Sequence, residues 1–299
     1  MIESPVTKRA IFIALIFSFF VCSSIFLNNY FDQRTKIIFC NVGQGDAAYI
    51  RIENKIDVLI DAGPDKSVLS CLGKYMPFWD RKIEIAFLSH PNNDHYSGYF
   101  FIADRYKIDK FITVNTTIMS KSYKKLLEIL SSKRIPLLIK TSGDKIKVMD
   151  GQFKLYWPPK GFNSSNDNDF SSVILFELRG IRLLFTGDAS PFVMSRLSHG
   201  SIDKIDILKI PHHGSKNGLT KKFLDLADPE VAVISVGKNN SYGHPSNIVL
   251  DMLKAKNIDI RRTDVEGDAV FKIPNYKLQI PRNKQITMIK SQKSNVQTV

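Results

Sequence analysis

The stretch EIAFLSHPNNDH, residues 84–95, decides how the rest of the sequence is interpreted. Its apolar half predicts a buried strand, and its polar half places His90, Asp94 and His95 on the loop at the end of that strand. On a tight strand-to-helix loop these three side chains can converge on one point. Imidazole and carboxylate together suit Zn²⁺, Mn²⁺ or Fe²⁺. Taken alone, the stretch is better explained as a loop whose polar residues cap the next helix.

Three later motifs repeat this arrangement, in which an apolar run ends in imidazole or carboxylate groups. They are LLFTGD (183–188), ILKIPHHGS (207–215) and SVGKNNSYGHP (235–245). The chain has 6 histidines, and all but His199 lie in these motifs or in the first one. Such clustering favours one shared metal site over several unrelated buried histidines.

Short β-rich runs separated by Gly, Asp and Asn predict the remaining architecture. The expected strands are 36–42, 47–52, 55–61, 154–158, 171–179, 181–187, 205–211, 231–237 and 271–274. The expected helices are 122–133, 221–227 and 246–256. This mixed order predicts an α/β domain, layered in the α+β manner, with the chemical groups on loops at strand ends.

In order and spacing these motifs resemble the metallo-β-lactamase superfamily. Within it they are similar to the C-terminal, extracytoplasmic hydrolase-like domain of the ComEC family of DNA-uptake (competence) proteins. The matching stretches are NVGQGDAAYI (41–50), LIDAG (59–63), SHPNNDHYSG (89–98), LLFTGDAS (183–190), LKIPHHGS (208–215), SVGKNNSYGHP (235–245) and RRTDVEGDAVF (261–271). The resemblance extends over residues 36–281. It implies an αββα sandwich with metal ions at the edge where the strands end.

The resemblance also implies a site that holds one or two divalent ions, Zn²⁺ or Mn²⁺. The ligands carried over from the family's motifs are His90, Asn92, Asp94, His95, Asp188 and His212. Asp188 corresponds to the aspartate that bridges two ions. Asp46, Asp61 and His213 are expected to orient the ligands through hydrogen bonds.

Two departures from the family pattern concern one of the two ion positions. Asn92 stands where the family has His or Asp, and a neutral amide binds zinc poorly. The family's histidine between the first motif and the TGD aspartate has no counterpart here, and Asn168 or Asp169 is the candidate replacement. The ion position nearest His90 is therefore expected to be the less complete one.

Hydrolysis is the reaction that such a site implies, because a divalent cation lowers the pKa of a bound water toward ~7. Asp94 is expected to orient or deprotonate that water, and His244 to stabilise developing charge or to protonate the leaving group. The resemblance and a net charge of +13 favour a phosphodiester substrate, single-stranded DNA. Two alternatives stay open. One is a small ester, thioester or lactam as substrate, and the other is a degenerate member that binds nucleic acid without cleaving it, which Asn92 favours.

The N-terminal run AIFIALIFSFFVCSSIFL, residues 10–27, carries no charge and follows Lys8 and Arg9. As a helix it would reach roughly 27 Å, which predicts an uncleaved transmembrane anchor or a signal segment. The basic pair favours an extracytoplasmic domain, secreted if the segment is cleaved. The expected division is a cytoplasmic segment (1–9), the anchor (10–27), a linker (28–35), the domain (36–281) and a flexible tail (282–299).

The three cysteines form no recognisable motif. Cys22 lies in the apolar N-terminal run. Cys40 and Cys71 are interpreted as small buried residues, the commoner fate of a lone cysteine, since nothing in the sequence argues for the alternative, a disulfide between them.

Overall fold

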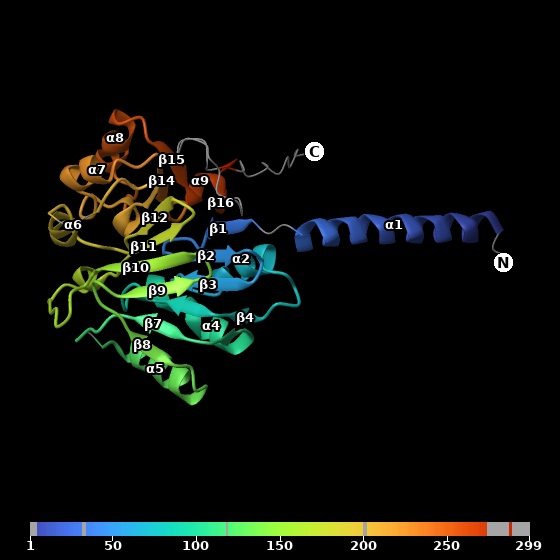
Figure 1. Cartoon of the computed structure of the whole chain (residues 1–299), viewed down its shortest axis with the longest axis horizontal. Coiled ribbons are helices and arrows are strands. Elements are labelled where there is room, and N and C mark those ends of the chain that lie inside the picture. Colours follow the sequence, from blue (N-terminus) through green and yellow to red (C-terminus); the bar gives the residue numbers. More distant parts are fainter. Residues whose placement is uncertain (1–4, 32–33, 118, 200–201, 274–286, 289–299) are drawn as a thin grey trace.

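The structure, a computed structural model, describes residues 5–31, 34–117, 119–199, 202–273 and 287–288. Two large sheets are stacked face to face, and helices cover the outer face of each (Figure 1). The predicted layered α/β class is therefore confirmed, with the four layers ordered αββα.

The first sheet combines the early strands with the last ones, in the order β17-β16-β1-β2-β3-β5-β7-β8. Its strands are β1 (Thr35–Phe39), β2 (Ala48–Ile52), β3 (Ile56–Ile60), β5 (Ile85–Phe87), β7 (Phe111–Thr113), β8 (Leu137–Ile139), β16 (Ala269–Ile273) and β17 (Thr287–Met288). Strands β3, β5, β7 and β8 are parallel, so their carboxyl ends meet at one edge. A separate pair, β4 (Lys82–Ile83) and β6 (Lys107–Ile108), lies apart from this sheet.

The second sheet has the order β15-β14-β13-β12-β11-β10-β9. Its strands are β9 (Lys145–Val148), β10 (Gly151–Trp157), β11 (Val173–Leu178), β12 (Ile181–Phe185), β13 (Ile207–Lys209), β14 (Val231–Ile234) and β15 (Asp259–Arg262). Strands β12 to β15 are parallel, and their carboxyl ends again lie side by side.

Helices close the sandwich on both sides (Figure 1). The first sheet is covered by α2 (Ser67–Tyr75), α3 (Asn93–Tyr96), α4 (Gly98–Arg105) and α5 (Lys121–Ser132). The second is covered by α6 (Pro191–Leu197), α7 (Lys221–Ala227) and α8 (Asn247–Ala255). The short helices η1 (Asp167–Phe170), η2 (Pro211–Gly214) and α9 (Thr263–Glu266) lie in connections between strands.

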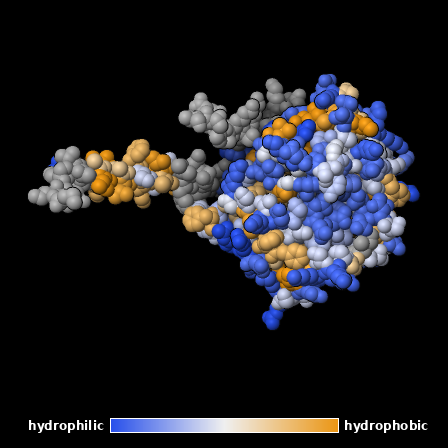
Figure 2. All heavy atoms as spheres, turned by 180° about the vertical axis from the view of Figure 1, so that it is seen from behind, coloured by the Kyte–Doolittle hydropathy of each residue, from blue (hydrophilic) through white to orange (hydrophobic). Residues whose placement is uncertain are grey.

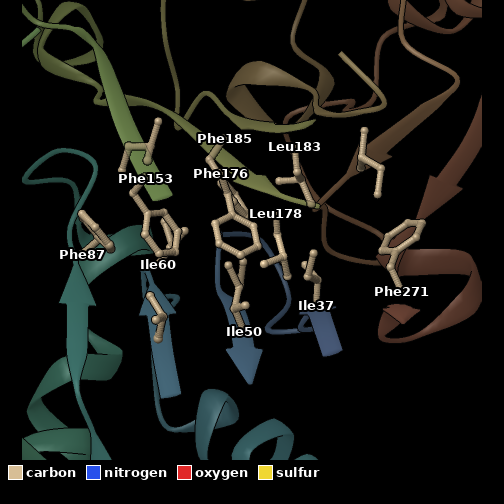
Figure 3. Packing of buried hydrophobic residues seen from close by; sticks show 14 of the residues in the cluster. Ile37, Ile50, Ile60, Phe87, Phe153, Phe176, Leu178, Leu183, Phe185 and Phe271 are labelled. Carbon is tan, nitrogen blue, oxygen red and sulfur yellow. The ribbon is translucent and has the colours of Figure 1, made fainter. Parts of the chain in front are cut away.

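The main core lies between the two sheets, where alternate side chains of each strand face the other sheet (Figure 3). Phe153 stacks on Phe176 with ring centroids 4.6 Å apart, and Phe87 from the first sheet packs against Phe153 at 5.2 Å. These large rings are fully buried. They join the two sheets into one rigid body, so the edge that carries the polar loops is held in place by a packed interior.

The N-terminal helix α1 (Pro5–Phe31) projects from the domain at the edge where β1 begins, away from the carboxyl ends of the parallel strands (Figure 1). Its apolar side chains are exposed, whereas much of the domain face seen in Figure 2 is hydrophilic. Within the part of the chain that the structure describes, no helix has both the length and the apolarity needed to cross a membrane. The predicted transmembrane span over 10–27 is therefore not supported. The predicted tail, 282–299, lies outside the described residues apart from 287–288.

A disulfide joins Cys40, at the end of β1, to Cys71 in α2, with the two Cα atoms 5.8 Å apart. The two residues are 31 positions apart in sequence, and both are buried under the first sheet's helices. The bond ties the outer helical layer to the strand that leads into the Gly43–Asp46 loop. Of the two interpretations that the sequence left open, the disulfide is the one the structure contains.

Breaking this bond is expected to lower the free energy of unfolding by about 3.7 kcal/mol, because it closes a loop of 31 residues in the unfolded chain. Urea unfolding of the chain with and without reductant measures the effect. A Cys40→Ala/Cys71→Ala variant should match the reduced wild type and be insensitive to reductant. Equal stability of oxidised and reduced wild type would contradict the prediction.

Candidate metal centre

Four side chains from three segments of the chain meet at the edge where the parallel strands end. Asp94, His95, Asp188 and His213 each offer one ligand atom, and these atoms all lie within 4.8 Å of one another. Asp94 and His95 belong to α3, just after β5; Asp188 follows β12, and His213 lies in η2 after β13. The sandwich therefore assembles one cluster from both sheets, with two imidazoles and two carboxylates.

The spacing of these groups fits a cation. His95 Nε2 lies 3.2 Å from Asp188 Oδ1, and His213 Nε2 lies 3.3 Å from Asp94 Oδ2 and 3.5 Å from Asp188 Oδ2. Among the residues that the structure describes, three buried ligand atoms at this place lack a hydrogen-bond partner of acceptable geometry: His90 Nε2, His95 Nε2 and Asp188 Oδ1. Leaving a buried polar atom unsatisfied is unfavourable, so three in one place fit a site built to coordinate a metal ion.

A second layer of polar groups orients the imidazoles. Asp61 Oδ2 lies 2.9 Å from His95 Nδ1, and Asp61 also accepts hydrogen bonds from the backbone N–H (2.7 Å) and hydroxyl (2.8 Å) of Ser89. Nδ1 of His213 faces Asp46 Oδ1 at 3.3 Å and the carbonyl oxygen of Ser235 at 2.9 Å. Because Nδ1 of each ring is engaged from behind, Nε2 points toward the cluster, as a metal ligand requires.

Lys209 is a buried functional residue that the sequence interpretation missed. Its ammonium group pairs with Asp46, donates a hydrogen bond to the carbonyl oxygen of Gly187 at 2.9 Å, and lies 3.9 Å from Asp188 Oδ1. Only 2% of the residue is exposed. The available signal was its position, since a lysine inside the apolar run IDILKIP has to be buried with a partner.

Charge within the cluster sets the protonation states. Burial opposes protonation of His213, but Asp188 and Asp46 outweigh it and raise its pKa to about 10. Burial would raise the pKa of Asp94, yet His95 and His213 hold it well below its ordinary value. Burial, together with neighbouring His95, lowers the pKa of His90 to about 3 and keeps this imidazole neutral. Asp94 is therefore ionised and His90 is in the neutral form that binds metals, whereas His213 carries a proton that a bound cation would displace.

The other side of the cluster is built from neutral groups. Asn92 donates a hydrogen bond from Nδ2 to Asn168 Oδ1 at 3.3 Å, and Asn168 Nδ2 lies 3.4 Å from His212 Nδ1. Nε2 of His212 is 3.8 Å from Asp188 Oδ2. Asp169 is turned away from the site, since its carboxylate accepts hydrogen bonds from the hydroxyl groups of Ser164 and Ser190.

Backbone geometry decides which histidine of the His212–His213 pair enters the cluster. Both residues have left-handed backbone angles, with φ values of 51° and 52°. Two such residues in succession reverse the chain sharply, which buries the ring of His213 while 26% of the His212 side chain stays exposed. The sequence interpretation gave the ligand role to His212 and a supporting role to His213. The structure brings His213 into the four-residue group and leaves His212 beside it.

His244 lies at the rim of the site, in the loop over 237–245. Its ring centroid is 5.9 Å from that of His212, and its Nδ1 atom is buried without a hydrogen-bond partner. Burial, with the neighbouring imidazoles of His212 and His213, lowers the pKa of His244. The ring thus lies beside His212, next to the four-residue group.

Comparison with known proteins adds relatives in sequence and in fold. No protein-family model matches the chain. ComE operon protein 3 of Bacillus subtilis is 26% identical over 253 residues, which cover 79% of this chain and 32% of that protein. Recombination protein 2 of Haemophilus influenzae is 27% identical over 252 residues, covering 83% and 30%. Competence protein ComA of Neisseria gonorrhoeae is 33% identical over 115 residues, covering 38% and 17%. The chain thus spans about a third of the length of the first two relatives and a smaller share of the third.

Solved structures with the same fold share little sequence. The metallo-β-lactamase fold protein YhfI from Bacillus subtilis superposes with a TM-score of 0.56 at 10% identity, covering 80% of this chain and 99% of that one. Zinc-bound PqqB from Methylobacterium extorquens superposes with a TM-score of 0.53 at 10% identity, covering 76% and 97%. These sequence relatives and the shared fold support the predicted resemblance to ComEC-like proteins of the metallo-β-lactamase superfamily.

Proposed function

We propose that the chain is a metal-dependent phosphodiesterase that cleaves DNA, with single-stranded DNA as its substrate. The observation that carries this proposal is the convergence of Asp94, His95, Asp188 and His213, together with three buried ligand atoms that have no hydrogen-bond partner. Mixed imidazole and carboxylate ligands suit Zn²⁺ or Mn²⁺. This group would hold one ion, and His90 with His212 and the neutral amides would hold a second more weakly.

A bound divalent ion would supply a hydroxide near neutral pH and would stabilise negative charge on a phosphoryl oxygen. Asp94 lies at the open side of the cluster with its side chain 34% exposed, where it can accept a proton from the attacking water. His244, whose ring lies beside that of His212, would stabilise the developing negative charge by donating a hydrogen bond, since its lowered pKa keeps the imidazole neutral. Lys209 and Asp46 hold the cluster's geometry from below.

Two further observations support DNA as the substrate. The net charge of +13 attracts a polyanion. Two of the sequence relatives are named for recombination and for competence, which are processes that act on DNA. A small ester or lactam has no comparable support from the chain.

The disulfide supports an extracytoplasmic location for the domain. Disulfides form and persist in oxidising compartments outside the cytoplasm and are rare inside it. The Cys40–Cys71 bond lies directly below the loop that carries Asp46, so the site would be assembled in such a compartment.

The direct test is to incubate the full chain with end-labelled single-stranded DNA and Mn²⁺ or Zn²⁺. We expect cleavage with a divalent ion, none after chelation, and recovery when the ion is added back. Elemental analysis of the purified chain gives the number of ions bound. If the purified chain holds no metal ion and binds DNA without cutting it, the proposed enzyme activity is wrong and the chain is a DNA-binding protein.

Replacing each of the two adjacent histidines in turn by alanine tests which of them binds the first metal ion. We expect His213→Ala to weaken metal binding by about 100-fold or more, because it removes a member of the buried group. His212→Ala, the matched control, should leave one ion bound and affect mainly the second. Isothermal titration with Mn²⁺ measures both affinities. A larger loss of the first ion in His212→Ala would reverse the assignment.

A further inference from the structure

A tyrosine stands exposed on the rim of the metal centre. Tyr242 is 69% exposed, although it lies only two positions from His244. Its ring is nearly parallel to that of His244, with an interplanar angle of 21° and centroids 5.9 Å apart. The His244 ring is in turn 5.9 Å from that of His212, whose Nε2 lies 3.8 Å from Asp188. The ring of Tyr242 is thus exposed to solvent and is separated from the cluster by the rings of His244 and His212.

The loop that carries this ring is braced. Asn240 donates hydrogen bonds to the carbonyl oxygens of Gly237 (3.0 Å) and His244 (2.7 Å). Its side-chain oxygen accepts from the backbone N–H groups of Tyr242 (3.2 Å) and His244 (3.0 Å). At the base of the loop, the N–H of Gly237 donates to Gln44 Oε1 at 3.2 Å, which links it to the loop of Asp46. A ring held in this way loses little conformational entropy when a ligand stacks on it.

We infer that Tyr242 is a stacking site for an unpaired nucleobase next to the phosphate that is cleaved. The inference rests on the proposed function and deepens it, because it names the part of the substrate that is recognised. Every nucleobase has a π-face that stacks on an aromatic ring, whereas a base inside a duplex is already stacked between its neighbours. An exposed tyrosine beside the cluster therefore selects single-stranded over double-stranded DNA without reading its sequence.

Charge around the ring fits the same ligand. Lys216, directly after the His213-Gly214-Ser215 turn, and Lys238, at the start of the braced loop, are both exposed. Each lies in a segment that also carries a histidine of the site, so each adds positive charge to the loops that surround the cluster. The arrangement matches the pairing of basic groups with aromatic platforms in proteins that bind single strands.

The test compares a labelled single-stranded oligonucleotide with an abasic oligonucleotide of the same length, which keeps the phosphates and lacks the bases. Binding is measured by fluorescence anisotropy with the full chain in EDTA, so that cleavage does not intervene. We expect the wild type to bind the normal strand roughly 5- to 150-fold more tightly than the abasic strand. Tyr242→Ala should abolish this preference, and Tyr242→Phe should keep it.

Phe78→Ala serves as the matched control, since Phe78 is 79% exposed and precedes β4, at the amino-terminal rather than the carboxyl-terminal end of the neighbouring strands. It should bind both strands as the wild type does. The inference is overturned if Tyr242→Ala still prefers the normal strand over the abasic strand as the wild type does. It is also overturned if the substitution weakens binding of both strands by the same factor. Cleavage with Mn²⁺ separates the two proposals: a chain that shows the Tyr242-dependent preference and cuts neither strand supports the stacking site and overturns the phosphodiesterase.

Discussion

Replacing Asp188 by alanine is expected to slow the cleavage of single-stranded DNA by about a thousandfold or more, the equivalent of ~4 kcal/mol of transition-state stabilisation. Asp188 is 2% exposed, and its two oxygens face His95 on one side and His213 on the other. Removing this carboxylate would delete the group that the two proposed ion positions share. Initial rates under matched Mn²⁺ concentrations give the comparison.

The matched control is Asp104→Ala, which removes a carboxylate that is 72% exposed on α4, outside the cluster. This variant should cleave at the wild-type rate. Thermal unfolding of the Asp188→Ala chain confirms that it is folded, so that a lost activity reports on the site. If Asp188→Ala and the wild type cleave equally, the assigned cluster is not the active site.

Replacing Lys209 by methionine is expected to lower the free energy of unfolding by about 3–5 kcal/mol, because it leaves the buried carboxylate of Asp46 without its nearest cation. Methionine keeps most of the length of the side chain and removes the ammonium group, with its charge and its hydrogen bond to the carbonyl oxygen of Gly187. Urea unfolding in EDTA measures the change without a contribution from bound metal. A double variant that also carries Asp46→Asn should regain most of the loss, since it contains no unpaired charge.

The effect of Lys209→Met should depend on pH. Burial would raise the pKa of Asp46, but Lys209 and His213 hold it below its ordinary value. A depressed carboxyl pKa stabilises the folded state at pH values above the unfolded pKa, and this stabilisation disappears as the pH falls through the folded one. The difference between wild type and variant should therefore be largest near neutral pH and shrink in acid. A difference that grows in acid would contradict the role given to this pair.

Much of the fold could be predicted because it depends on local pattern. The strand over 85–87 and the polar residues after it form a strand followed by a short helix, and the later motifs likewise follow β12 and β13. Parallel strands bring their carboxyl ends to one edge, so strand-end motifs far apart in sequence had to meet. The predicted roles of Asp46 and Asp61 remain hypotheses, but the structure does place both carboxylates behind the imidazoles.

What could not be predicted depends on tertiary geometry. The entry of His213 rather than His212 into the four-residue group follows from two left-handed residues in succession, and no pattern of residue types signals that turn. The Cys40–Cys71 bond requires α2 to pack over the end of β1, which a spacing of 31 residues does not reveal. Lys209 was overlooked because its partner Asp46 lies in a distant segment that reaches it only across the sandwich.

The return of β16 to pair with β1 has a consequence for how the domain is made. Asn41, just after β1, bonds through its backbone to Asp268, 227 residues further along the chain. Closing so long a loop is slow, and on a ribosome β1 has to wait for β16 to emerge. Until then β1 lacks its neighbour on that side, and an unpaired strand edge invites association with other chains. Synthesis of this domain should therefore be most vulnerable to aggregation, and most responsive to chaperones, just before its last strands appear.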